Sequence, residues 1–188
     1  MKYLALDYET GGLYPRYHAP VSLAVVLMDD GKVVDSFDKM FPQFADLAYT
    51  PKALEVNGQK WAEIESRLHT EFDVMNELSE WTKKHDSQYL PIVAHNAEFD
   101  HGFYLSSVMR SKVDPLLGGW MCTKRIARAV LTHMKKFSLD DVLSYYAMKR
   151  TSEVHGSLED AILTGQVFAK LMTQPQTTAP IGVQTEDV

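Results

Sequence analysis

The stretch from Val21 to Met28 (Val-Ser-Leu-Ala-Val-Val-Leu-Met) restricts the fold of this chain more than any other. It is almost wholly apolar, which is typical of a strand that is covered on both faces. Lys2 to Glu9 predicts a strand before it. The turn signal Asp29-Asp30-Gly31 and the segment from Lys32 to Phe41 predict a hairpin after it. The beginning of the chain therefore predicts a unit of three strands.

Spacing and capping residues along the rest of the chain predict helices that alternate with two further strands. Apolar residues recur at three- and four-residue spacings from Ile64 to Lys84, which predicts one long helix. Leu90 to Ala94 and Trp120 to Thr123 are short apolar runs that predict strands. This order predicts a mixed three-layer α/β fold. Further helices are expected from Pro51, after Asn96 as N-cap (carrying Phe99, Phe103, Leu105 and Met109), and at Lys124 to Thr132, Ser138 to Tyr146 and Ser157 to Met172.

The composition fits one globular domain. With 188 residues, of which 45% are hydrophobic and 23% charged, the chain can bury a sizeable core. We expect the domain to cover residues 1–172, because residues 173–188 are rich in Thr, Gln and Pro and predict a disordered tail. The chain contains no run of about 18 apolar residues, so no membrane span is predicted. The start of the chain does not resemble a secretory signal. The single cysteine, Cys122, lies in an apolar run typical of a core, and we expect a cytoplasmic protein.

The net charge limits how the chain could bind nucleic acid. Its 25 acidic residues exceed the 19 Lys and Arg residues, which gives a formal charge of −6. This balance argues against a protein that binds nucleic acid through a broad basic surface. It does not argue against an enzyme whose positive charge is a bound metal ion.

Two carboxylates stand at the end of the first expected strand, in Leu4-Ala5-Leu6-Asp7-Tyr8-Glu9-Thr10-Gly11-Gly12. Side chains alternate along a strand, so Asp7 and Glu9 project to the same side. Two acids on one face of an apolar strand are costly to bury without positive charge, and a divalent metal ion would provide it. The stretch alone leaves open that the strand ends before Asp7 and that both acids are solvated in a loop.

Three further residues join this pair as candidates. Asp100 lies in the first turns of the helix after Asn96, near the end of the preceding strand. His155 would lie just before the helix that starts at Ser157, and Asp160 in the first turn of that helix. Taken alone, each has an ordinary explanation: a surface acid, a surface histidine, or an acid that interacts with the helix dipole.

Together these residues resemble the motifs of the DEDDh (DnaQ-like) family of 3′→5′ exonucleases. Asp7-Tyr8-Glu9-Thr10 is similar to the first motif, Asp-x-Glu-Thr, and the segment from His95 to Asp100 is similar to the second. His155 and Asp160 are similar to the third motif, His-x-x-x-x-Asp. The order of the motifs also agrees, and the resemblance covers Lys2 to about Met172. It implies a ribonuclease H-like fold, in which helices flank a five-stranded mixed sheet.

The resemblance also implies how these residues act. In such enzymes two divalent ions, Mg²⁺ or Mn²⁺, activate water, stabilise charge on phosphorus and assist the departing 3′ oxygen. By resemblance, Asp7 bridges both ions and Asp100 supports the second. Glu9 and Asp160 complete the site that activates water. His155 is the expected general base, since an imidazole with a pKa of about 6.5 accepts a proton at neutral pH.

Other positions of the resemblance concern the bound nucleotide. The family holds the terminal nucleotide with residues that follow the first motif. Asn57 stands where the family usually has His, so its contact departs from the pattern. Phe99 could stack on a base, or it could equally pack in the core under its helix. The expected nucleotide contacts are Thr10, Gly11, Leu13, Asn57, Asn96, Phe99 and His155, whereas His18, His95, His101 and His133 are expected to be structural or surface residues.

These expectations describe a metal-dependent 3′→5′ exonuclease that releases nucleoside monophosphates from single-stranded or frayed DNA. DNA is favoured over RNA because the segment from Ser138 through the third motif is more similar to proofreading subunits than to the oligoribonuclease branch, which usually has Met at the position of Thr10. A polymerase or another replication protein is a candidate partner. The alternatives are an exoribonuclease of the ribonuclease T or oligoribonuclease type, a non-catalytic polymerase-binding adaptor with this fold, and a small-molecule phosphodiesterase, which would need a closed pocket.

Overall fold

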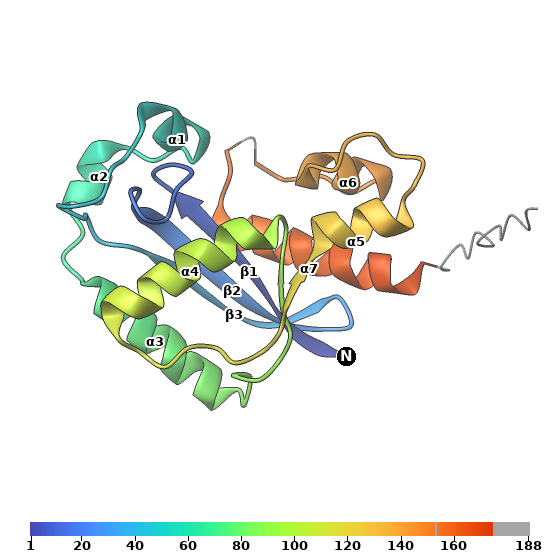
Figure 1. Cartoon of the computed structure of the whole chain (residues 1–188), viewed down its shortest axis with the longest axis horizontal. Helices are drawn as coiled ribbons and strands as arrows, with labels where there is room; N and C mark the ends of the chain where they lie inside the picture. The colour runs from blue at the N-terminus through green and yellow to red at the C-terminus, as the bar shows by residue number, and fades with distance from the viewer. Residues whose placement is uncertain (153, 175–188) are drawn as a thin grey trace, which may run out of the picture.

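The computed structural model describes residues 1–152 and 154–174, and a five-stranded mixed sheet forms its centre (Figure 1). The strands lie in the order β3-β2-β1-β4-β5. β1 (Lys2–Thr10) pairs antiparallel with β2 (Pro20–Asp29), which pairs antiparallel with β3 (Lys32–Met40). β4 (Ile92–Ala94) and β5 (Trp120–Cys122) extend the sheet in parallel with β1. The five strands expected from the sequence are confirmed.

Helices cover both faces of this sheet, which gives the expected three layers. α3 and α4 pack on one face, in an apolar cluster that includes Leu4 and Leu6 of β1. α7 packs on the other face, against Tyr3 and Ala5 of the same strand. α5 and α6 pack in turn against α7. The helices are α1 (Pro51–Val56), α2 (Trp61–Glu65), α3 (Glu71–Lys84), α4 (Ala97–Ser111), α5 (Thr123–Val130), α6 (Leu139–Tyr145) and α7 (Ser157–Thr173).

The prediction of a single helix over residues 64–84 is wrong. The structure has two helices, α2 and α3, with a break between them. Leu68, which was expected on the apolar face, lies in the break and is 96% exposed. A capping box starts α3: the Thr70 hydroxyl accepts from the Asp73 N–H, and the Asp73 carboxylate accepts from the Thr70 N–H. Arg67 fixes the break, since its guanidinium donates to two backbone carbonyl groups, one in β2 and one just after β3.

The expected apolar face of α4 is wrong in part. Leu105 and Met109 are 43% and 78% exposed. Asn96 precedes the helix in a left-handed conformation (φ 69°) and makes no side-chain capping bond. The buried face instead carries Asp100 and two serines beside Phe103. Hydropathy alone could not identify such a face, because an acid and hydroxyl groups take the places of apolar residues.

The remaining expectations from composition have mixed outcomes. Cys122 is buried, as expected. α7 continues through Thr173, and the expected disordered tail falls from residue 175 onward outside the described residues. Within the described part of the chain, no helix is both long enough and apolar enough to cross a membrane.

Candidate active site

The two faces of β1 carry different side chains at its carboxyl end. Tyr8 points into the cluster with α4, where its ring lies 5.9 Å from that of Phe41 and 6.2 Å from that of Phe103. Asp7 and Glu9 alternate with Tyr8 and so project to the side that α7 covers. β1 continues to Thr10, which excludes the alternative that both acids lie in a loop.

The start of α7 brings two further candidates to that side. Glu9, His155 and Asp160 each offer a ligand atom, and these atoms lie within 4.8 Å of one another. Nδ1 of His155 is 3.4 Å from Oδ2 of Asp160. The helix start is held against β2, because the hydroxyl of Ser157 bonds with that of Ser22 at 2.9 Å. An acid of the first motif and both residues of the third therefore meet.

Asp100 approaches the same end of β1 from α4. Its side chain is almost fully buried, and Oδ1 accepts a hydrogen bond of 3.1 Å from the backbone N–H of Tyr8. Because Tyr8 lies between Asp7 and Glu9 in the strand, this bond holds Asp100 close to both acids. The candidate site thus lies at the carboxyl ends of parallel strands β1 and β4, where open α/β sheets bind their ligands.

Burial changes the acid–base properties of these carboxyl groups. It raises the pKa of Glu9 to about 7, against the opposing charge of Arg150. Burial also raises the pKa of Asp100 to about 8, with a contribution from Glu9. The pKa of Asp7 is raised well above its ordinary value by burial and then by repulsion from Asp100 and Glu9. Buried carboxylates that lack sufficient positive charge are the donor set that a divalent cation favours, so these residues fit a metal centre.

Arg150 belongs to none of the three motifs and was not predicted as a site residue. Its Nη1 forms an ion pair with Asp160, and its Nε donates to Asp140 of α6 at 2.9 Å. The Arg150 side chain is only 11% exposed. Burial and the charge of Arg150 lower the pKa of His155, so that this ring stays neutral at neutral pH. The signal available in the sequence was a cation placed shortly before the third motif.

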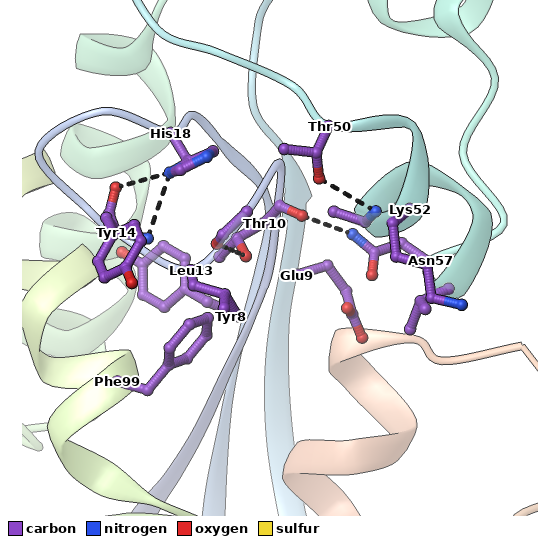
Figure 2. A pocket seen from close by; sticks show the side chains of 13 residues that line it. Tyr8, Glu9, Thr10, Leu13, Tyr14, His18, Thr50, Lys52, Asn57 and Phe99 are labelled. Carbon is purple, nitrogen blue, oxygen red and sulfur yellow. Dashed lines mark hydrogen bonds between the residues drawn. The ribbon is translucent and has the colours of Figure 1, made fainter.

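A cavity of about 530 Å³ adjoins the acids, between the end of β1, α1 and α4 (Figure 2). Phe99 lines this cavity and also packs on the ring of Phe103 at 5.0 Å. Its side chain therefore lies both at the cavity and against the core. Leu13 and Tyr14, 71% and 62% exposed, lie at the rim. The cavity therefore opens to solvent, unlike the closed pocket that a small-molecule phosphodiesterase would need.

Four of the expected nucleotide contacts line this cavity: Thr10, Leu13, Asn57 and Phe99. Asn57 is buried, and its Nδ2 donates to the carbonyl of Thr10 at 2.9 Å, as the dashed line in Figure 2 marks. The other three, Gly11, Asn96 and His155, are not among the lining residues. Gly11 instead packs on the chain before α1, where a Cβ would lie 2.7 Å from the Ala48 carbonyl oxygen. Gly12 takes its place in the lining.

Two lining residues, His18 and Lys52, were not identified by any motif. His18 was expected to be structural, and Nδ1 does contact the backbone of Tyr14. Gly12 is required beside it, because a Cβ there would collide with the imidazole ring. The other three histidines make the expected structural contacts: His95 with Thr123, His101 with Trp120 and His133 with Tyr145.

Residues 4–168 match the family model described as exonuclease (RNase_T), and the chain belongs to this family. The match confirms the resemblance read from the three motifs. The description of that family, exonuclease, agrees with the class of enzyme expected from the motifs.

Similar proteins carry the same domain as a part of longer chains. The DNA polymerase III of PolC type from Staphylococcus haemolyticus is 28% identical over 176 residues, which are 92% of this chain but 11% of that protein. Exonuclease I of E. coli in complex with a dA16 oligonucleotide superposes with a TM-score of 0.76 at 16% identity, over 92% of this chain and 41% of that one. A zinc-ion-bound form of the E. coli exonuclease I–ssDNA complex gives 0.74 at 18% identity, over 91% and 40%. These structures confirm the ribonuclease H-like fold.

Proposed function

We propose that the protein releases nucleoside monophosphates from the 3′ ends of single-stranded or frayed DNA, with residues 1–172 as the exonuclease domain. The observation that carries the proposal is the convergence of Glu9, His155 and Asp160, within 4.8 Å, beside an open cavity of about 530 Å³. A cavity of this size falls in the range of small-molecule and cofactor sites. One terminal nucleotide would thus reach the acids while the strand remains outside.

Four carboxylates would hold the metal ions: Asp7, Glu9, Asp100 and Asp160. Two divalent ions, Mg²⁺ or Mn²⁺, would when bound supply a nucleophilic water and offset the charge on the phosphoryl group and the leaving 3′ oxygen. The raised pKa values of Glu9 and Asp100 support this assignment, since they reflect burial without enough positive charge. The zinc-bound form of exonuclease I adds support for a divalent ion in this fold.

His155 would accept the proton of the attacking water. Its lowered pKa keeps the ring neutral at physiological pH, which a general base requires. A ring that carries its hydrogen on Nδ1, directed to the Asp160 carboxylate 3.4 Å away, leaves Nε2 to take the proton. General-base catalysis contributes about 10²–10⁴-fold, so the acids and their ions would have to supply most of the acceleration.

The cavity would hold the terminal nucleotide through its apolar rim. Phe99 offers an aromatic face for a base, a contact worth about 1–3 kcal/mol in proteins that bind single strands. Leu13 also lines the cavity, and its side chain, 71% exposed, would be covered when a base enters. Lys52 supplies a positive charge to the same cavity.

DNA is the proposed substrate, and a replicative polymerase the proposed context. The relative from S. haemolyticus is a DNA polymerase, and exonuclease I of E. coli has been captured with a deoxyadenosine oligonucleotide. Both similarities support DNA over RNA. The chain spans 11% of the polymerase, so a polymerase partner would have to be a separate chain or a further part of the same one.

The test compares end-labelled DNA and RNA strands of one sequence, incubated with Mg²⁺ or with a chelator. Wild type is run beside Asp7→Ala, and circular dichroism checks that the variant is folded. We expect a metal-dependent ladder that shortens from the 3′ end, faster for DNA and absent for Asp7→Ala.

Each other outcome contradicts a named part of the proposal. A faster RNA ladder would replace the substrate by RNA, and full activity of Asp7→Ala would remove the acids from catalysis. No degradation of either strand, together with no stabilisation by Mg²⁺ or Mn²⁺, would favour the polymerase-binding adaptor.

A further inference from the structure

Positive charge is concentrated in one segment of this acidic chain. Residues 123–150, which form α5, α6 and the segments after each, contain seven of the 19 Lys and Arg residues but two of the 25 acids. The segment therefore carries a formal charge of +5, while the rest of the chain carries −11. A net charge of −6 conceals this polarity.

Five of these seven cations are exposed, and we call them the α5–α6 basic surface: Arg125, Arg128, Lys135, Lys136 and Lys149. Arg125 pairs with Glu98 of α4. In the described part of the chain, Arg128 and Lys136 make no ion pair with a carboxylate, and Arg128 lies over the ring of Phe137 at 5.9 Å. Most of this positive charge is therefore available to a ligand.

Specific contacts join this surface to the candidate active site. Nε2 of His95, the first residue of the second motif, lies 3.0 Å from the carbonyl oxygen of Phe137, in the middle of the basic segment. Arg150 connects Asp160 of the site to Asp140 at the start of α6. In Figure 1, the start of α7 lies between α1, which lines the nucleotide cavity, and α6. Glu9 lines the cavity and Asp160 pairs with Arg150 at the end of the basic segment, so the acids adjoin both.

We propose that the α5–α6 basic surface binds the phosphates of the substrate strand on the 5′ side of the bond to be cleaved. The inference rests on the proposed function, in which the cavity holds the 3′-terminal nucleotide. A strand that enters the cavity from across the acids would come from the side on which Arg150 joins Asp160 to α6. His133 and Tyr145, both exposed and with ring centroids 5.3 Å apart, add aromatic side chains on the same segment. Elsewhere the acidic surface would repel the strand.

The test measures binding in the inactive Asp7→Asn background with Mg²⁺, using a fluorescent trinucleotide and a DNA strand of about 12 nucleotides. Arg128→Gln/Lys136→Gln is compared with Lys32→Gln/Lys84→Gln, which removes the same charge from the start of β3 and the end of α3. Neutralising the basic surface should weaken binding of the long strand about tenfold at low salt. Two lost phosphate contacts should reduce the slope of log K against log salt by about 1.4. The trinucleotide and the control pair should show neither change.

Several outcomes would overturn the inference. An unchanged affinity of the long strand, an equal loss with the control pair, or an equal loss for the trinucleotide would each do so. Capture of an acidic protein or of anionic vesicles by this surface, with DNA binding unaffected, would also reassign it. If wild type cleaves DNA in every one of these cases, only this inference fails; if wild type neither binds nor cleaves any strand, the proposed function fails first.

Discussion

On one face of β1, Leu4, Leu6 and Tyr8 are buried in an apolar cluster with α3 and α4, whereas on the other face Asp7 and Glu9 are enclosed beside α7. The same strand therefore carries burial of two kinds. Removing the apolar face from water stabilises the fold. Burial of the acidic face raises the pKa of both of its carboxyl groups, which shows that their charged forms are disfavoured. The site is built at a cost that the opposite face offsets.

The largest expected effect separates the two faces by substitution of neighbouring residues. Asp7→Asn should reduce cleavage by about 10³-fold or more, since a ligand and its charge are lost. Its free energy of unfolding in chelator should stay equal or rise, because repulsion with Asp100 and Glu9 disappears. Tyr8→Ala should instead cost about 3–5 kcal/mol of stability, as expected for an aromatic residue in a core.

Urea unfolding of both variants and of wild type measures this contrast. Tyr8→Phe is the matched control, because it keeps the ring and should remain close to wild type. A destabilised Asp7→Asn or an unaffected Tyr8→Ala would show that the two faces do not differ as described.

The next effect concerns proton transfer on the acidic face. His155→Ala should slow single-turnover cleavage by about 10²–10⁴-fold. Because burial and Arg150 lower the pKa of His155, wild type should remain active until the pH falls below the ordinary histidine value of about 6.5. The acid limb of the pH–rate profile should disappear in His155→Ala. His101→Ala, at a ring that stacks on Trp120, is the control that should retain both the rate and the limb.

A smaller effect is expected at the cavity. Phe99→Leu should raise KM by about tenfold with little change in kcat, since a lost stacking contact of about 1.4 kcal/mol affects binding of the terminal nucleotide. Phe72→Leu serves as the control, because Phe72 is 52% exposed on α3 and lines no part of the cavity. A fall in kcat with unchanged KM would instead make Phe99 a residue that orients the acids.

The smallest effect is a dependence of stability on pH in the absence of metal. The pKa of Glu9 rises from its ordinary 4.5 to about 7 in the folded protein. Between these values the folded state holds a proton that the unfolded state has released, so stability declines as the pH rises through about 7. The melting temperature in chelator should fall by a few degrees from about pH 5 to about pH 8. Glu9→Gln should flatten the decline, and a rise with pH in wild type would contradict the assignment.

The sequence was sufficient to predict the strands and the three acidic motifs. Strand alternation fixed Asp7 and Glu9 on one side, and that is a local property. The two helices α2 and α3 were merged because an apolar spacing crossed the break, although Thr70 and Asp73 carried a readable capping box. Local capping outweighed periodicity there.

Residues that act through long-range contacts could not be predicted in the same way. Arg150 meets Asp160 and Asp140 only when α6 and α7 are brought together by the fold. His18 enters the cavity because Gly12 leaves room for its ring. Gly11, expected to touch the nucleotide, instead fits closely against the chain before α1. In each case the position of the side chain depends on a contact with another segment or on a steric fit, and neither can be read from a local motif.

The backbone N–H of His155 donates to the carbonyl of Val56, the last residue of α1, at 3.4 Å. α1 also lines the cavity through Ala53 and Val56. A terminal nucleotide that displaces α1 as it enters would therefore move His155 as well. The imidazole would then no longer be placed to accept the proton of the attacking water. Cleavage would then depend on how the nucleotide fits the cavity, so that an ill-fitting 3′ end would be bound without being cleaved.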